Sequence, residues 1–461
     1  MTAHPNSLQA RDIAYQFHPN TNLRRHERVG PIIIDRGEGI YVYDDQGRQY
    51  IEALAGLWSV GVGFGEKRLV DAAAKQMAKL PYYHTFTHKS HEPSIELAEK
   101  LVKLSPPGLD HVFFTNSGSE ANDTVVKMVW YYNNALDRPL KKKFIARNGG
   151  YHGITVVAGS LTGLQVNQRG FDLPLPFAKH VTCPHHYRFA KEGETEEQFS
   201  TRLAEELEAK ILEEGPETVA AFIGEPLIGA GGVLPPPKGY WPKMQAVCRK
   251  YDVLVVADEV INGFGRLGKM FASEHYGIEP DILVCSKQIT SSYLPLSAIL
   301  MSDRIYQVIA DQSEKLGTFG HGFTTSGHPV ATAVALENLA IIEERDLVGN
   351  VNRVGPYMQK RLREFADHPL VGEVRGDGLI AAVELVADKK TKARFDPPGK
   401  VGFYAFEKGH EHGLIARAVG DSICFCPPLI ITEAQIDDMV ARFAATLEDT
   451  EAWVAAGMPA S

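Results

Sequence analysis

Cysteine is scarce in this chain. Only 5 of its 461 residues are cysteine, and no two of them form a C-x-x-C pair. The sequence therefore lacks the dense, even set of cysteines that indicates a secreted disulfide framework. The spacing of Cys183, His185 and His186 matches no zinc motif, so we expect no metal site. These absences favour a reducing compartment, and we expect the protein to be cytoplasmic.

A surplus of basic residues is lacking too. The chain has 48 Lys and Arg residues against 57 Asp and Glu residues, a formal net charge of −9. Binding to nucleic acid needs a basic face that neutralises phosphates, so we expect no nucleic-acid partner. The one basic run, 141–143, is predicted to lie in a solvated loop before a strand.

Long apolar runs are missing as well. No run approaches the roughly 20 residues that span a bilayer, and residues 1–20 contain no apolar signal segment. We therefore expect no membrane partner and no secretory signal. Hydrophobic residues make up 44% of the chain and charged residues 23%, which excludes a disordered, collagen-like or coiled-coil protein.

The middle of the chain has an α/β pattern. Its length allows about three domains, or one large α/β domain with an appendage. Runs such as 253–257 and 282–285 are apolar throughout, which is typical of strands buried on both faces of a parallel sheet. The predicted strands are 112–115, 143–147, 219–224, 253–257 and 282–285, and the predicted helices are 67–79, 93–104, 119–136 and 240–251.

After about residue 330 the pattern predicts a smaller α+β unit. Its predicted helices are 329–344, 351–366, 401–412 and 433–449, and its predicted strands are 371–375, 379–385 and 421–425. A β-hairpin is predicted at 39–54 around Asp45-Gln46-Gly47, and it is expected to join this smaller unit. Ser7 is predicted to cap an N-terminal helix.

A strand followed at once by a helix is predicted at 111–122, with Ser117, Gly118 and Ser119 at the junction. The first N–H groups of a helix have no partner within it, and together with the helix dipole they bind anions. Gly118 lets the backbone approach a phosphate closely, and the two serines add hydroxyl donors. The pattern fits a phosphate site or a simple N-cap with a turn glycine.

Two ionisable residues follow buried strands. Asp258 comes directly after 253–257, and Lys287 comes shortly after 282–285. Ligands of parallel α/β sheets bind beyond the carboxyl ends of the strands. Asp258 is a candidate site carboxylate, or else a helix cap or part of a structural ion pair. Most lysines are surface residues, but one held in a partly apolar site can have a lowered pKa and form a Schiff base.

The segment 263–268 formally matches G-x-G-x-x-G. A dinucleotide fingerprint begins directly after its strand, whereas residues 258–262 intervene here. Its acidic partner should close the next strand, yet Asp281 precedes that strand. The glycines are therefore better explained as shaping a loop, and a nicotinamide-dependent oxidoreductase is a remote alternative.

An anion site, a strand-end carboxylate and a strand-end lysine together suit pyridoxal phosphate. This cofactor needs a phosphate cradle, an acid for its ring nitrogen and a lysine for its aldehyde. With these residues the chain resembles the class III (subgroup II) aminotransferases of the fold-type I pyridoxal-phosphate enzymes, and within them the ω-transaminases that use pyruvate. The resemblance covers nearly the whole chain, through EGIYVYDDQGRQYIEALAGLWSVGVGFG, FFTNSGSEANDTVVKMVW, NGGYHG, GEPLIGAGG, ADEVINGFGRLG, CSKQITSSYLPLSA, HGFTTSGHPVA and RAVGDSICFCPPL.

The resemblance implies a role for each matching residue. Lys287 is the Schiff-base lysine and moves a proton between the donor carbon and the cofactor, and Asp258 keeps the ring nitrogen protonated. The other implied cofactor contacts are Ser117, Gly118 and Ser119 at the phosphate, Tyr151 and Val260 on the two ring faces, and Glu225 near the ring. Without the resemblance, Tyr151 could equally be a surface aromatic residue and Glu225 a structural one.

The segment 321–324 resembles the part of these enzymes that reaches the phosphate of the other subunit. It makes Thr324 a contact of the partner's cofactor and implies a homodimer with shared active sites, with a tetramer left open. The family usually has an aromatic residue two positions after Phe323, where this chain has Thr325. We expect this departure to affect how tightly the loop packs.

Arg417 resembles the arginine that binds the substrate carboxylate bidentately, although the default for an arbitrary arginine is a surface ion pair. Leu57, Trp58 and Phe86 match positions that line the substrate pocket, together with Tyr151. The resemblance to the ω-transaminases implies pyruvate as the amino acceptor and an amine or ω-amino acid as the donor, in a ping-pong reaction. The resemblance also implies a large cofactor-binding domain at 61–328 and a small domain at 329–461, which the segment 1–60 joins.

Other functions stay open. The donor could be a monoamine, a polyamine, taurine or β-alanine, and 2-oxoglutarate could replace pyruvate. The same family includes decarboxylases and aminomutases. A non-catalytic binding protein is disfavoured because Lys287, Asp258 and the Ser117–Ser119 junction occur together.

Overall fold

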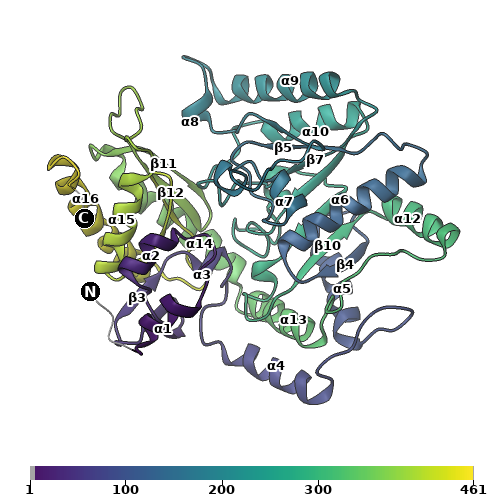
Figure 1. The fold of residues 1–461 in the computed structure, drawn as a ribbon, viewed down its shortest axis with the longest axis horizontal. Helices are drawn as coiled ribbons and strands as arrows, with labels where there is room; N and C mark the ends of the chain where they lie inside the picture. The colour runs from purple at the N-terminus through teal and green to yellow at the C-terminus, as the bar shows by residue number, and fades with distance from the viewer. Residues whose placement is uncertain (1–5, 460–461) are drawn as a thin grey trace.

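A computed structural model describes residues 6–459 of the chain. Figure 1 shows a larger lobe built from the middle of the chain and a smaller lobe in which the purple N-terminal and yellow C-terminal segments lie together. Within the described residues, no helix is both long enough and apolar enough to cross a membrane.

The larger lobe contains a seven-stranded sheet with the order β4-β10-β9-β8-β7-β5-β6. Only β10 runs antiparallel to its neighbours, and all other strand pairs are parallel, so the predicted mainly parallel sheet is confirmed. Every residue of β7, β8, β9 and β10 is buried, as expected for strands covered on both faces. The strands are β4 His111–Thr115, β5 Lys143–Arg147, β6 Ala178–Val181, β7 Val219–Gly224, β8 Leu254–Asp258, β9 Ile282–Cys285 and β10 Ser297–Met301.

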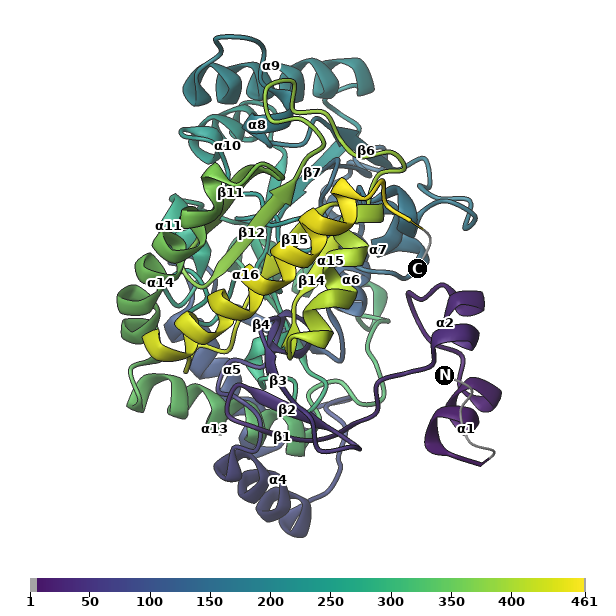
Figure 2. The same cartoon turned by 90° about the vertical axis from the view of Figure 1, so that its left-hand side faces the viewer.

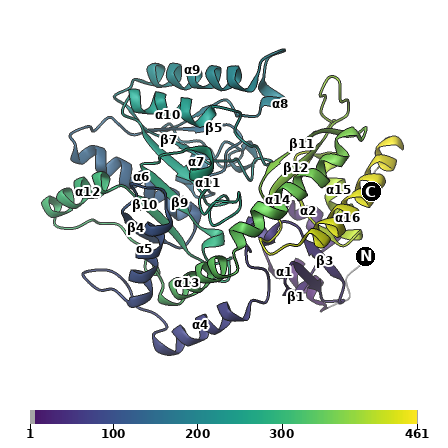
Figure 3. The same cartoon turned by 180° about the vertical axis from the view of Figure 1, so that it is seen from behind.

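Helices cover both faces of this sheet. On one face, α6 (Gly118–Ala135) and α12 (Asp303–Leu316) pack on side chains such as Phe144 and Val256. On the other face, α9 (Glu196–Glu214) and α10 (Tyr240–Lys250) pack on the alternate side chains, such as Val255. Figure 3 shows α13 beside α4 and α5, and these helices also contact each other closely. The bounds of these and the short elements are α3 Ala55–Trp58, α4 Lys67–Lys79, α5 Glu92–Leu104, α7 Val156–Leu161, η1 Gln165–Asn167, α8 His186–Phe189, α11 Ala272–Tyr276, η2 Lys287–Ile289 and α13 Pro329–Glu344.

The smaller lobe combines the two ends of the chain. β13 pairs in parallel with β3, which joins the predicted hairpin to the C-terminal part of the chain. A second, antiparallel sheet has the order β11-β12-β15-β14, and Figure 2 shows α16 crossing in front of it. The division at residues 60 and 328 stays a prediction. The bounds are α1 Leu8–Tyr15, α2 Leu23–Val29, β1 Ile34–Glu38, β2 Tyr41–Asp44, β3 Gln49–Glu52, α14 Leu347–Arg363, η3 Glu364–Asp367, β11 Val371–Asp377, β12 Ile380–Leu385, α15 Lys400–Glu411, β13 Leu414–Ile415, β14 Arg417–Val419, β15 Ser422–Phe425 and α16 Glu433–Ala455.

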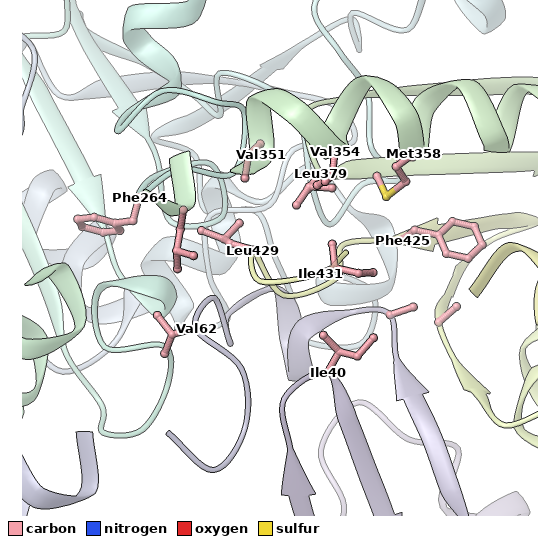
Figure 4. Close-up of a cluster of buried hydrophobic side chains, with 14 of the residues drawn as sticks. Ile40, Val62, Phe264, Val351, Val354, Met358, Leu379, Phe425, Leu429 and Ile431 are labelled. Carbon is pink, nitrogen blue, oxygen red and sulfur yellow. The ribbon is translucent and has the colours of Figure 1, made fainter. Parts of the chain in front are cut away.

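One apolar core links the two lobes. Figure 4 shows Ile40 near the N-terminal hairpin, Val351 on α14 and Phe264 from the larger lobe around Leu429 and Ile431. All five side chains are almost fully buried. This shared core fixes the two lobes against each other.

Two sequence predictions need correction. No element was predicted between residues 148 and 218, where the structure has α7, β6, α8 and α9. The basic run 141–143 is not a solvated loop, because Lys141 is only 6% exposed and its amine donates to the carbonyl oxygens of Pro216 and Tyr251. Burial of that amine lowers the pKa of Lys141.

Candidate active site

A cavity of about 370 Å³ lies where several strands end. β4, β5, β7, β8 and β9 all point the same way, so their carboxyl ends meet at one edge of the sheet. The residues that follow these ends converge on the cavity. Eight predicted site residues line it: Ser117, Gly118, Ser119, Tyr151, Glu225, Asp258, Val260 and Lys287.

The N-terminus of α6 forms one wall. Ser117 is its N-cap, and the hydroxyl oxygen accepts the N–H of Glu120 at 3.2 Å. The N–H groups of Gly118 and Ser119 make no hydrogen bond to any residue within 6–459, so they are free to bind an anion. A Cβ atom at Gly118 would lie 3.3 Å from Val260 and narrow this wall. The wall is therefore an open cradle for a phosphate group.

Asp258 is buried at the end of β8 and held by three donors. Its Oδ2 accepts hydrogen bonds from His152 Nδ1 at 2.8 Å and from Asn122 Nδ2 at 2.9 Å. Its Oδ1 accepts only the N–H of Val260, at 3.1 Å, among the described residues. A second lone pair on Oδ1 is thus available for a ring N–H, which is the contact that a pyridine ring requires.

The side chain of Lys287 lines the cavity. Its Nζ makes no hydrogen bond or ion pair with any part of the chain that the structure describes. Burial lowers the pKa of Lys287 to about 8, against the opposing effect of the nearby Asp258 and Glu225 carboxylates. The residue also has a positive φ of 49°, a strained backbone conformation that is typical of functional sites. These properties suit a nucleophilic amine.

Glu225 supports the cavity through the backbone. Its two carboxylate oxygens accept the N–H groups of Tyr151 at 2.9 Å and Gly229 at 2.8 Å. Burial raises the pKa of Glu225, and burial also raises the pKa of Tyr151. Glu225 therefore fixes the turn that carries Tyr151.

Five predicted site residues do not line this cavity: Leu57, Trp58, Phe86, Thr324 and Arg417. Arg417 is nevertheless close, because its charge acts on the pKa values of both Tyr151 and Lys287. It forms no ion pair with a carboxylate among residues 6–459, which differs from the surface ion pair that is the default for an arbitrary arginine. An arginine beside a cavity without a carboxylate partner is suited to bind one from a substrate.

Trp58 and Leu57 lie on a strained turn. Trp58 is 1% exposed and packs with Ile261, which lines the cavity, while Leu57 is 53% exposed. Ala55 and Trp58 both have positive φ. The buried carboxylate of Glu52 accepts the N–H of Gly56 in this turn, and burial raises the pKa of Glu52 to about 7.

The loop that carries Thr324 is hydrogen-bonded to the end of β4, in part through Thr325 itself. The Thr325 hydroxyl donates to the side-chain oxygen of Asn116 at 3.0 Å, and the Ser326 hydroxyl donates to the carbonyl oxygen of Phe114. The Tyr82 hydroxyl donates to the carbonyl oxygen of Thr324 at 2.7 Å. Phe86 is 44% exposed beside the same loop, at Gly322.

Sequence reasoning missed Asn122, His152 and Glu52. Asn122 and His152 stand in two of the motifs quoted above, but nothing in the local pattern shows that they meet Asp258. The available signal was chemical, since a buried carboxylate at a strand end needs donors. Their hydrogen bonds hold Asp258 in place.

These features together test the fit of pyridoxal phosphate. Three groups have no partner within residues 6–459 and match the cofactor. The N–H groups of Gly118 and Ser119 fit its phosphate, the second lone pair on Asp258 Oδ1 fits its ring nitrogen, and the amine of Lys287 fits its aldehyde. The residues present therefore match the cofactor's three requirements.

Comparison of the sequence with known proteins supports the fit of this cofactor. Residues 23–447 match the family model described as aminotransferase class-III. Gamma aminobutyrate transaminase 1, mitochondrial, of Solanum lycopersicum is 52% identical over 424 residues, which are 92% of this chain and 82% of that protein.

Solved structures are similar over almost the whole chain. The ω-transaminase of Pseudomonas jessenii in complex with PMP is 63% identical with a TM-score of 0.96, and the match covers 98% of this chain and 100% of that one. A transaminase with L-alanine is 60% identical with a TM-score of 0.91, covering 92% of this chain and 100% of that one. The chain belongs to the class III aminotransferases, fold-type I enzymes that use pyridoxal phosphate as their cofactor.

Proposed function

We propose that this protein transfers an amino group from an amine or an ω-amino acid to pyruvate by a ping-pong mechanism. The observation that carries the proposal is Arg417, a cation without a carboxylate partner in the described chain that lies near Lys287 and Tyr151. One such arginine fits a monocarboxylate such as pyruvate better than a dicarboxylate such as 2-oxoglutarate. The similar transaminase with L-alanine supports this, since alanine is the aminated form of pyruvate.

Each residue has a defined task in the proposed reaction. Bound pyridoxal phosphate supplies an electron sink for the carbon that loses its proton. Lys287 Nζ takes that proton from the donor carbon and passes it on to the cofactor, because a pKa of about 8 makes the amine an effective base near neutral pH. Asp258 keeps the ring nitrogen protonated, and the α6 N-terminus with Ser117, Gly118 and Ser119 binds the phosphate. Tyr151 and Val260 enclose the ring, with Glu225 behind Tyr151.

Arg417 must serve two substrates. Pyruvate presents a carboxylate, whereas an amine donor can present an apolar group at the same place, beside Leu57, Trp58 and Phe86. We propose that Arg417 pairs with the first and swings away for the second. In Arg417→Ala, the half-reaction with pyruvate should therefore weaken far more than the half-reaction with an apolar amine. Equal weakening of both in single-turnover absorbance measurements would disprove a mobile arginine.

The donor can be found directly. Cofactor-loaded enzyme is mixed with an aromatic amine, γ-aminobutyrate, β-alanine, taurine or putrescine, and the loss of the visible cofactor absorbance is followed. Pyruvate or 2-oxoglutarate is then added to restore it. We expect recovery with pyruvate. γ-Aminobutyrate is the second candidate donor, because the relative from Solanum lycopersicum is named for it. Release of CO₂, or a shift of the amino group within one substrate, would instead indicate a decarboxylase or an aminomutase.

A homodimer is part of the proposal. Thr324, Phe86 and Leu57 are exposed around the cavity region, and a second subunit would cover them. Sedimentation of the cofactor-loaded protein should give twice the mass of the chain, or four times that mass if dimers pair. A monomer with full activity would contradict shared active sites. The cytoplasmic location expected from the sequence stays a prediction.

A further inference from the structure

Asp12, His18 and His26 form a compact cluster outside the active site. Asp12 lies on α1, His26 lies on α2, and His18 lies in the segment between the two helices. Both histidines direct Nε2 at the same carboxylate oxygen, Asp12 Oδ2, at 2.9 Å each. The three side chains are 12%, 22% and 12% exposed. The cluster is therefore largely shielded from solvent but reachable from it.

The geometry suits a metal ion. Zinc binds histidine nitrogen and carboxylate oxygen at about 2.0–2.2 Å in a tetrahedral arrangement, so its ligand atoms lie about 3.4 Å apart. The 2.9 Å between each imidazole nitrogen and Asp12 Oδ2 would therefore widen by about half an ångström when the ion binds. The His18 and His26 rings lie 4.2 Å apart at 40°, as two neighbouring imidazole ligands would. Two imidazoles and one carboxylate make a ligand set that zinc, nickel, cobalt and copper prefer.

The two helices that carry the cluster, α1 and α2, have little packing to hold them together. Neither α1 nor α2 contains a buried residue, so no apolar core holds these helices together. Figure 2 shows them beside the body of the molecule and joined to it by an extended segment. The ion pair between Arg25 and Glu407 on α15, at 2.6 Å, is one of their few polar links to the rest of the chain. A metal bridge between two small elements supplies the stability that a missing core cannot.

Residues 6–459 contain one other cluster of histidine and carboxylate side chains, and it already holds a cation. His185, Glu373 and Glu384 also lie within ligand distance of one another, but Arg375 pairs with both glutamates at 2.7 Å and 2.5 Å. A cation already occupies the acceptor oxygens there. The carboxylate of Asp12 has no such partner among the described residues.

We propose that Asp12, His18 and His26 bind one divalent transition-metal ion, such as zinc, and that this ion links α1 to α2. Water completes the coordination, because the described residues supply three ligands. The alternative is a purely hydrogen-bonded cluster in which both imidazoles donate to Asp12.

Glutamine variants separate the two possibilities. In His18→Gln and His26→Gln the amide can still donate a hydrogen bond to Asp12, but the imidazole ligand is lost. The matched control is His412→Gln, since His412 pairs with one carboxylate, Asp449, at 2.8 Å and no second histidine. Untagged, cofactor-loaded, full-length protein is titrated with Zn²⁺ by calorimetry and with Co²⁺ by visible absorption. Protection of the 16–22 segment from protease is measured with and without Zn²⁺.

The proposal predicts one ion per chain in the unmodified protein and the control. Each glutamine variant, and Asp12→Asn, should weaken binding by about tenfold or more and lose the protection by Zn²⁺. Circular dichroism checks that each variant is folded. Absence of Zn²⁺ binding, or equal binding by all variants, would overturn the proposal and leave the hydrogen-bonded cluster.

Discussion

Lys287 combines a lowered pKa with an amine that has no partner in the described chain. A buried cation is normally paired with an anion. Because the Lys287 amine has no such partner within residues 6–459, it is available to react with an aldehyde. Below a pH of about 8 the amine is protonated and cannot attack an aldehyde, and above that pH it is neutral. The rate at which cofactor-free protein captures pyridoxal phosphate should therefore rise with pH and level off above about 8, as stopped-flow absorbance can show.

The charge of Asp258 affects the pH at which the capture rate rises. Its negative charge raises the pKa of Lys287, so Asp258→Asn should move the rise in capture rate to lower pH. Asp281 is a matched control, because it precedes β9 at the other end of the sheet, where it accepts the N–H of Val255 at 2.8 Å and pairs with Arg304. Asp281→Asn should leave the profile in place. A profile that does not depend on pH would contradict the assignment of Lys287.

The sequence could predict the residues that stand in strong local patterns. Asp258 and Lys287 follow apolar strands, and the Ser117–Ser119 junction opens a helix, so each could be placed without knowing its neighbours. Asn122, His152 and Glu52 could not, because their importance lies in partners far along the chain, such as Asp258 106 positions after His152. Long-range hydrogen bonds leave little trace in a single sequence.

At the scale of elements, the N-terminus of α6 both caps the helix and forms a wall of the cavity. Ser117 caps the helix, and the free N–H groups beside it face the cavity. Ser117→Ala should cost about 1 kcal/mol of stability through the lost cap and should also weaken the affinity for pyridoxal phosphate. Denaturation and a fluorescence titration measure the two effects.

Thr195→Ala is the control for that variant. Thr195 caps α9 in the same way, accepting the N–H of Gln198 at 3.3 Å, but it lies away from the cavity. It should lose a similar amount of stability and keep its cofactor affinity. If both variants lost affinity equally, α6 would not be the phosphate cradle.

Elements were predictable where their patterns are local. The buried strands β7, β8 and β9 and the helix α4 lie within a residue of their predicted bounds. The helix α9 was missed although Thr195 and Gln198 form a capping box, a signal that was present in the sequence. β10 was missed for another reason, since this short run is defined by antiparallel pairing with the distant β4 and with β9.

At the scale of the whole molecule, Arg375 joins the two lobes. It is 8% exposed, pairs with Glu384 at 2.5 Å and donates to the carbonyl oxygen of Gly232 in the larger lobe at 2.7 Å. Arg375→Met would leave Glu373 paired only with His185 and Glu384 only with Arg188, and it would remove the hydrogen bonds to Gly232, so we expect a loss of about 2 kcal/mol of stability. The exposed ion pair of Arg24 and Glu27 is the control, and Arg24→Met should leave the midpoint of thermal unfolding unchanged. Equal midpoints for both variants would show that Arg375 does not hold the lobes together.

The measurement that tests the central claim most directly is amino transfer by Lys287→Ala. The variant should fold normally but transfer no amino group from any amine to pyruvate or 2-oxoglutarate above the rate without enzyme. Lys141→Ala is the matched control, because Lys141 is also buried with a lowered pKa but lies outside the cavity. It should lose stability and keep transfer. Undiminished turnover by Lys287→Ala would contradict the account.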